Sequence, residues 1–137
     1  MYKELEMIYF EERVGVVSVE NKRQSLGKAG EDLAARFLTE SGLTIITRNY
    51  RCSKGEMDII ARDGEALVFI EVRTRRSSYR GWGEETITQQ KARRLQAIAS
   101  YYVVQQRYAS WPCLRFDVIA IRWTGERPDT IWIKAAF

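Results

Sequence analysis

The chain has 137 residues, of which 45% are apolar, and this is typical of one globular domain with its own core rather than of a disordered chain. Its net charge of +4 suits a polyanionic partner but also describes many ordinary proteins. The absence of histidine excludes Ser-His and Cys-His nucleophile arrangements, so any chemistry must use carboxylates, Lys, Arg, Tyr or a hard metal ion.

The sequence also indicates a cellular location. No apolar stretch approaches the roughly 18 residues that a membrane span needs, and the charged segment 1–15 lacks the continuous apolar core of a secretory signal. Cys52 and Cys113 match no metal-binding spacing, and in a chain without an export signal we interpret them as reduced thiols. We therefore expect a cytoplasmic protein that does not bind membranes.

The first half of the chain predicts one helix and three strands. Residues 1–25 have no clear period, and we expect them to form an accessory or poorly ordered segment, although part of it has the composition of a strand. Residues 27–42 predict a helix with an apolar stripe that includes Leu33 and Phe37. Three segments then have the pattern of strands: 43–51, 56–62 and 66–74.

The second half predicts a helix between a loop and two strands. Residues 77–85 read as a glycine-containing loop, and residues from about 86 to 107 have a helical period. Two strands follow, at 114–123 and 130–137. The order of helix, three strands, helix and two strands predicts a single α/β domain over residues 26–137, in which helices flank a mixed central sheet.

The charged residues of the hairpin formed by 56–62 and 66–74 fall on one face. If Asp63 and Gly64 form a two-residue turn, the strands meet in three opposed pairs: Arg62 with Glu65, Asp58 with Phe69, and Glu56 with Glu71. Opposed residues share a face, as do residues two apart on one strand. That face then carries Glu56, Asp58, Glu71 and Arg73. Neighbouring acids repel one another unless a cation lies among them.

Two helical charges point towards the same place. Glu31 lies at the edge of the apolar stripe of the first helix, and Lys91 lies in the middle of the apolar face of the second. A lysine there must pair with an acid, extend to solvent or serve a site. A hard divalent cation, Mg²⁺ or Mn²⁺, binds carboxylates, waters and substrate phosphate. Such an ion polarises a phosphodiester, while an adjacent Lys or Arg stabilises the developing charge.

Four stretches in this order resemble the YraN-type family of small, largely uncharacterised bacterial proteins, which are related to archaeal Holliday-junction resolvases. They are "GKAGEDLAARFLTESGLTIITRNYR", "KGEMDIIARDGEALVFIEVRTR", the helix that carries Lys91, and "RFDVIAI". The resemblance covers residues 24–123 and implies the restriction-endonuclease-like fold. Its nuclease signature is an acid, a variable gap and then (D/E)-x-K. Asp58 matches the first acid, Glu71 the second, and Glu31 the acid that the first helix contributes.

The resemblance implies a DNA endonuclease site, with one departure. Arg73 stands where the signature has lysine, and arginine binds phosphate but gives up no proton at neutral pH. Lys91 is the natural substitute. The implied catalytic set is Glu31, Asp58, Glu71, Arg73 and Lys91, and the three acids would hold Mg²⁺ or Mn²⁺. Nucleic-acid contacts are expected from four arginines: Arg75, Arg76, Arg80 and Arg94.

Partners and alternatives follow from the same residues. The expected substrate is DNA, branched or single-stranded, and a homodimer would suit the two symmetric strands of a junction. The alternative function is a non-catalytic nucleic-acid-binding module that retains the fold. Two interpretations also stay open for the arginines after Glu71, which form either a phosphate-contacting rim or the polar face of an edge strand. We expect Glu56 to be a surface residue and Asp117 to be structural, and Tyr79 and Trp82 either to stack on bases or to fold back on the core.

Overall fold

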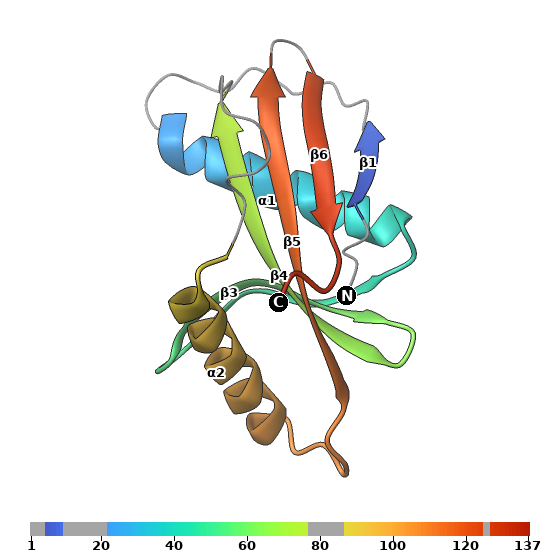
Figure 1. The fold of residues 1–137 in the computed structure, drawn as a ribbon, viewed down its shortest axis with the longest axis vertical. Helices are drawn as coiled ribbons and strands as arrows, with labels where there is room; N and C mark the ends of the chain where they lie inside the picture. Colours follow the sequence, from blue (N-terminus) through green and yellow to red (C-terminus); the bar gives the residue numbers. More distant parts are fainter. Residues whose placement is uncertain (1–4, 10–21, 77–86, 125–126) are drawn as a thin grey trace.

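A single mixed sheet with a helix on each face forms the part of the protein that the computed structural model describes, which is residues 5–9, 22–76, 87–124 and 127–137 (Figure 1). The elements are β1 (Leu5–Tyr9), α1 (Lys22–Glu40), β2 (Thr44–Cys52), β3 (Gly55–Asp63), β4 (Ala66–Arg76), α2 (Gln89–Gln105), β5 (Cys113–Thr124) and β6 (Arg127–Ile133). In the sheet they run β1-β6-β5-β4-β3-β2. Strands β4 and β5 are parallel, and the other neighbours are antiparallel. This is the predicted α/β architecture, consistent with a restriction-endonuclease-like fold.

Helix α1 covers one face of the sheet, and in Figure 1 it passes behind β4, β5 and β6. Its predicted stripe is confirmed, because Leu33, Phe37 and Leu38 are almost fully buried. They pack on apolar side chains of four strands, including Ile59, Ile70, Ile119 and Trp132. The Phe37 ring meets Trp132 edge-on, with 5.7 Å between the ring centroids. This contact connects α1 to β6.

Helix α2 covers the opposite face with a second apolar cluster. It buries Leu95, Ile98, Ala99, Tyr102 and Val103. These side chains pack on β3, β4 and β5 through Met57, Ile60, Leu67, Phe69 and Phe116. Each face of the sheet therefore has its own core, and because side chains alternate along a strand, β3 and β4 supply residues to both.

The two ends of the described chain differ from the predicted elements. Strand β1 pairs with β6, and α1 begins at Lys22, before the predicted start at residue 27. Strand β6 ends at Ile133 rather than at residue 137. Ala135 has a φ of 50°, which turns the chain, and the Phe137 ring then lies 4.9 Å from Phe116.

The hairpin register differs from the predicted one. Asp63 pairs with Ala66 and Ile59 pairs with Ile70, so the turn consists of Gly64 and Glu65. The predicted pairs Arg62–Glu65, Asp58–Phe69 and Glu56–Glu71 are therefore wrong. Glycine takes the first turn position with a φ of 58°, while Asp63 stays in the ladder and its carboxylate binds Arg115 Nη1 at 2.8 Å. Each residue of β3 therefore lies opposite a β4 residue two positions later than the predicted one. Because side chains alternate between the faces of a strand, a shift of two residues leaves every side chain on its predicted face.

Asp117 is structural, as the sequence predicted. The side chain lies in β5 at 1% exposure. Its carboxylate accepts hydrogen bonds from three parts of the chain: Arg115 Nη2 at 2.9 Å, Trp132 Nε1 at 2.9 Å and the amide of Ala135 at 3.0 Å. A buried carboxylate is tolerated only when it is paired and hydrogen-bonded in this way. It links β5 to β6 and to the turn that follows.

Helix α1 approaches β4 closely at Gly30. A Cβ atom on Gly30 would lie 2.0 Å from Thr74 Oγ1 and 3.1 Å from Thr74 Cβ. Gly27, one turn earlier on the same helix, faces open space out to 4 Å. The missing side chain at position 30 therefore lets the first turns of α1, and with them Glu31, lie against β4.

These two glycines provide a matched test of the close approach. We expect Gly30→Ala to lower the free energy of unfolding by about 1–3 kcal/mol through overpacking. Gly27→Ala should raise it by about 0.5–1 kcal/mol, because alanine is the better helix former. Urea unfolding of both variants measures the difference, and Thr74→Ala should restore part of the stability of Gly30→Ala. Equal stability of the two single variants would contradict the packing at Gly30.

Candidate functional site

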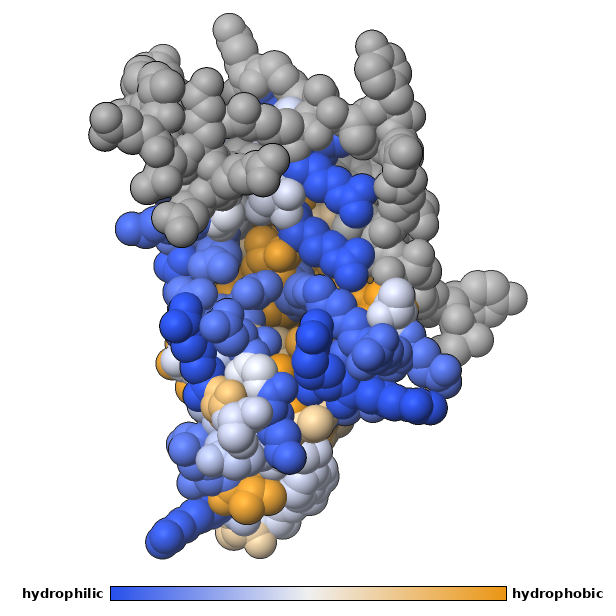
Figure 2. All heavy atoms as spheres, turned by 90° about the vertical axis from the view of Figure 1, so that its left-hand side faces the viewer, coloured by the Kyte–Doolittle hydropathy of each residue, from blue (hydrophilic) through white to orange (hydrophobic). Residues whose placement is uncertain are grey.

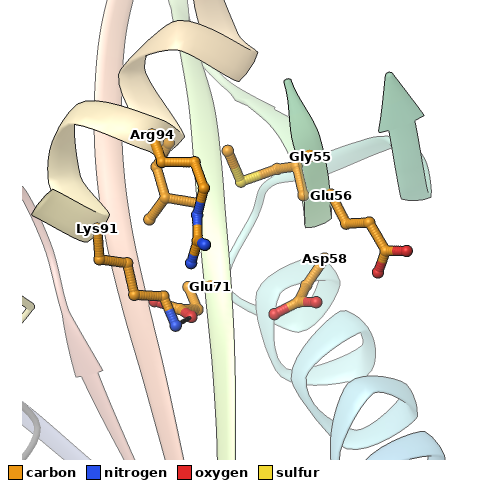
Figure 3. Close-up of a pocket in the computed structure, with 8 residues that line it drawn as sticks. Gly55, Glu56, Asp58, Glu71, Lys91 and Arg94 are labelled. Carbon is orange, nitrogen blue, oxygen red and sulfur yellow. Dashed lines mark ion pairs between the residues drawn. The ribbon is translucent and has the colours of Figure 1, made fainter. Parts of the chain in front are cut away.

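A cavity opens where β3 and β4 stop pairing. Their ladder ends at the pair Ile59–Ile70. Immediately beyond it, the Asp58 carboxylate accepts a hydrogen bond from the amide of Val72 at 2.8 Å. The side chain of Asp58 thus occupies the place of a ladder hydrogen bond. The cavity of about 320 Å³ lies between the strand ends and the start of α2, lined by Gly55, Glu56, Met57, Asp58, Glu71, Lys91, Arg94 and Leu95 (Figure 3).

Glu71 and Lys91 form an ion pair inside this cavity. Lys91 Nζ contacts Glu71 Oε1, so of the three options that the sequence left for this lysine, pairing with an acid is the one that the structure shows. The Glu71 side chain is only 12% exposed, and that of Lys91 is 32% exposed. Glu71 Oε2 is buried without a hydrogen-bond partner in the described part of the chain. Arg73 Nη2 lies 3.8 Å from this oxygen. One oxygen of the carboxylate is therefore available as a ligand.

The start of α2 fixes the position of Lys91. Thr88 is the N-cap of the helix, and its side chain accepts a hydrogen bond from the amide of Lys91 at 3.2 Å. Lys91 therefore lies in the first turn of α2. Arg94 follows three residues later on the same side of the helix, and Figure 3 shows its guanidinium directed into the cavity. Neither an ion pair nor a hydrogen bond occupies Arg94 within the residues that the structure describes.

Burial raises the pKa of Asp58 from its ordinary value of 3.8 to about 6. The hydrogen bond from Val72 opposes this shift, the negative charges of Glu31 and Glu71 add to it, and the positive charge of Lys91 opposes it. Asp58 is thus a carboxylate whose charge is costly at this position. A nearby cation would relieve that cost.

Glu31 acts on Asp58 through its charge but lines a different cavity. Its charge acts on Asp58, but its side chain lines a second cavity, of about 600 Å³, together with Gly27, Lys28, Asp32, Arg48, Asn49 and Arg51. In this second cavity Arg48 Nη2 binds the Asp32 carboxylate at 2.6 Å. Glu31 therefore contributes to the electrostatic field at Asp58 without lining the cavity that Asp58 and Glu71 share.

The remaining predicted residues fall into three groups. Arg73 lies beside Glu71, and Arg75 is half-buried in β4. Glu56 is 65% exposed and pairs with Arg51 at 3.1 Å, so its prediction as a surface residue is confirmed. The last group lies outside the described side chains: Arg76, Arg80, Tyr79 and Trp82.

Two features of the cavity escaped the sequence analysis. Gly55, the first residue of β3, has a φ of 136°, and a Cβ atom there would lie 3.1 Å from Ile98 Cδ1. This position beneath α2 therefore suits only glycine. The glycine in "KGEMD" is a visible signal for such a position. The amide of Val72 has no signal in the sequence, because any residue except proline carries one.

The donor atoms suit a hard cation with an incomplete protein shell. Within the described residues, no three His, Cys, Asp or Glu side chains lie close enough together to hold a metal ion. Mg²⁺ commonly binds only one or two carboxylates, with waters and substrate phosphate completing the coordination. Asp58 and Glu71, whose Oε2 accepts no hydrogen bond within the described residues, meet that requirement. The predicted third ligand, Glu31, lines the other cavity.

Comparison with known proteins places the chain in a family. A family model described as uncharacterised protein family UPF0102 matches residues 30–121. The chain belongs to UPF0102. The predicted resemblance to the YraN-type family is thereby confirmed. The matched UPF0102 region contains Glu31, Asp58, Glu71 and Lys91.

Three UPF0102 relatives show how far the similarity extends. A protein of Desulfitobacterium hafniense (strain Y51) is 55% identical over 115 residues, which cover 82% of this chain and 95% of the relative. One from Caldicellulosiruptor saccharolyticus is 46% identical over 120 residues, covering 85% and 99%. One from Nocardia farcinica is 42% identical over 116 residues, covering 84% of this chain and 91% of the relative.

Neither of the two described helices is long and apolar enough to cross a membrane.

The buried carboxylate predicts a specific dependence of stability on pH. Because the pKa of Asp58 is higher in the folded protein than its ordinary value, the folded state binds more protons between pH 4 and 6, and stability falls as the pH rises through that range. Asp58→Asn should therefore be similar to the wild type near pH 4 and more stable by roughly 2–3 kcal/mol at pH 7. Urea unfolding across this range measures the gain.

The exposed Glu56 supplies the control for this prediction. Glu56→Gln neutralises an acid two residues away on the same strand, whose carboxylate is largely in solvent. Its effect on stability should change little between pH 4 and pH 7. A gain for Asp58→Asn that is the same at both pH values would contradict the burial of the Asp58 charge.

Proposed function

We propose that this protein is a divalent-metal-dependent endonuclease that hydrolyses phosphodiester bonds in DNA, with branched or single-stranded DNA as substrate. The observation that carries the proposal is the convergence of Asp58 and Glu71 with Lys91 and Arg94 in one cavity. Two acids from adjacent strands face two cations from the start of one helix (Figure 3). This arrangement suits a phosphodiester, because a metal ion and basic side chains can both contact its oxygens.

Asp58 and Glu71 are the residues that would hold Mg²⁺ or Mn²⁺. Such an ion, when bound, supplies Lewis-acid polarisation of the phosphodiester and lowers the pKa of a coordinated water. The hydrogen bond from Val72 fixes one oxygen of Asp58, whose side chain lines the cavity. Glu31 supports the site by adding negative charge near Asp58.

The basic residues of the cavity would position the scissile phosphate. Lys91 and Arg94 lie in the first turns of α2, where the helix dipole also favours an anion. Arg73 lies beside Glu71 and adds positive charge close to the metal ligands. Arginine does not release a proton at neutral pH, so Arg73 would stabilise charge rather than activate water.

A hydrophilic face and a positive net charge suit a charged partner. Figure 2 shows hydrophilic residues over most of the described part of the side that faces the viewer, with hydrophobic atoms between them near its middle. The net charge of +4 acts in the same direction. Arg75, Arg76 and Arg80 remain proposed contacts for phosphates of the DNA. A homodimer would suit a junction, which offers two symmetric strands.

The alternative is a nucleic-acid-binding module without turnover. Three observations favour it. Arginine replaces the signature lysine at position 73, and Lys91 already occupies one oxygen of Glu71. The described residues also lack a metal cluster of three protein ligands. Under this alternative, the protein binds DNA but cleaves none.

Nicking assays decide between the two functions. We expect the wild type to nick a four-way junction or single-stranded DNA in Mg²⁺ or Mn²⁺, and Asp58→Asn and Glu71→Gln to lose about 100-fold or more of that rate. Glu56→Gln is the matched control, since it lines the same cavity while its carboxylate binds Arg51. DNA binding without metal-dependent cleavage would favour the alternative, and neither binding nor cleavage would contradict both.

A second experiment tests the substitution at position 73. If Lys91 performs the role of the signature lysine, Lys91→Ala should reduce the nicking rate strongly, while Arg73→Lys should change it less than about tenfold. If the missing lysine limits the reaction, Arg73→Lys should instead raise the rate. Single-turnover cleavage of the best substrate measures both variants. Wild-type cleavage by Lys91→Ala would remove Lys91 from the catalytic role.

A further inference from the structure

We propose that Lys91 competes with the divalent cation for Glu71, and that a substrate phosphate opens the site by drawing Lys91 away. The cation and the phosphodiester then bind cooperatively, each favouring the other. This inference rests on the proposed function, because it assigns an order to the assembly of that site.

The ion pair between Lys91 and Glu71 is the closed arrangement. Lys91 Nζ contacts Glu71 Oε1, while the Glu71 side chain is only 12% exposed. An ammonium on Oε1 and a divalent cation on Oε2 of one carboxylate repel each other at short distance, and a partly buried site screens this repulsion little. Binding a cation at Oε2 therefore favours the movement of Lys91 away from Glu71.

The second oxygen of Glu71 shows that the closed arrangement is incomplete. Glu71 Oε2 is buried, no described residue donates a hydrogen bond to it, and Arg73 Nη2 lies 3.8 Å away. Burying a charged oxygen without a hydrogen bond is costly. A divalent cation would satisfy this oxygen, whereas Lys91 satisfies only Oε1. Glu71 thus favours the replacement of Lys91 by the cation once Lys91 has another anion to bind.

Arg94 provides the place where that anion would arrive. Its guanidinium points into the cavity beside Lys91, and no ion pair or hydrogen bond engages it in the described part of the chain. A phosphate bound by Arg94 would lie one helical turn from Lys91, within reach of its flexible stem. Transfer of Lys91 from Glu71 to the phosphate leaves the carboxylate free for the cation.

Linkage makes this exchange measurable. If the phosphate raises the affinity for the cation, the cation must raise the affinity for the phosphate by the same factor. Removing the ammonium of Lys91 should raise the affinity for the cation when no phosphate is present. It should also reduce the increase in that affinity which the phosphate causes.

The test measures the affinity for Mn²⁺ from the electron paramagnetic resonance signal of the free ion, without nucleic acid. Lys91→Gln should bind Mn²⁺ about tenfold more tightly than the wild type, and Glu71→Gln should lose binding. Arg94→Gln is the matched control, because it removes the same charge from the same cavity but leaves the ion pair intact. The Mn²⁺ affinity of Arg94→Gln should exceed that of the wild type by less than about threefold. Equal gains for both variants would overturn the competition, since loss of charge alone would explain them.

The second arm adds a short single strand with slowly hydrolysed phosphorothioate linkages, after subtraction of Mn²⁺ binding by the strand alone. The strand should raise the Mn²⁺ affinity of the wild type about tenfold and that of Lys91→Gln clearly less. Equal enhancement in both proteins would overturn the inference while leaving the proposed endonuclease intact. Absence of Mn²⁺ binding in every variant, with and without the strand, would overturn the proposed metal site and this inference together.

Discussion

The hydrogen bond between the Asp58 carboxylate and the amide of Val72 determines where the candidate site can form. Because a side chain rather than a β3 carbonyl accepts this bond, the regular pairing of β3 with β4 ends at Ile59–Ile70 while the amide stays satisfied. The cavity begins at that point, and Glu71 faces it from the neighbouring strand. The same position removes Asp58 from solvent and raises its pKa to about 6, which makes its negative charge costly.

The site joins two halves of the molecule that have separate cores. The acids belong to strands held between both helices, whereas Lys91 and Arg94 come from the first turns of α2. Thr88 fixes the start of that helix by capping it, so the lysine reaches Glu71 from a defined position. Lys91 neutralises Glu71 but leaves one buried oxygen without a donor in the described residues. This missing hydrogen bond, together with the convergence of acids and cations in the cavity, is the reason that we assign the cavity to a ligand rather than to stability alone.

Individual residues show which predictions a sequence supports. Lys91 was predictable, because a helical period places it among apolar residues, where a lysine needs a partner. Asp58 and Glu71 were correctly placed on one face although the register was wrong, since a shift of two residues preserves side-chain alternation. Glu31 was harder to place, because a residue at the edge of a helical stripe can face either way, and it lines a different cavity. The strand register itself depends on whether Asp63 joins the turn or the ladder, and its contact with Arg115 comes from a distant strand.

The sequence by itself determined the order of elements, the apolar faces of both helices, the family, and the residue types available for chemistry without histidine. These depend on local periodicity and composition, which act within a few turns or strands. Only the tertiary structure decided that Asp58 binds Val72, that Gly30 lets α1 lie against Thr74, and that Glu71 has one satisfied and one unsatisfied oxygen. These features involve residues that are separated in the chain and meet only after folding. The contact of Asp58 uses a backbone amide, which almost every residue type carries, whereas the features of Gly30 and Glu71 depend on the space that packing leaves around them.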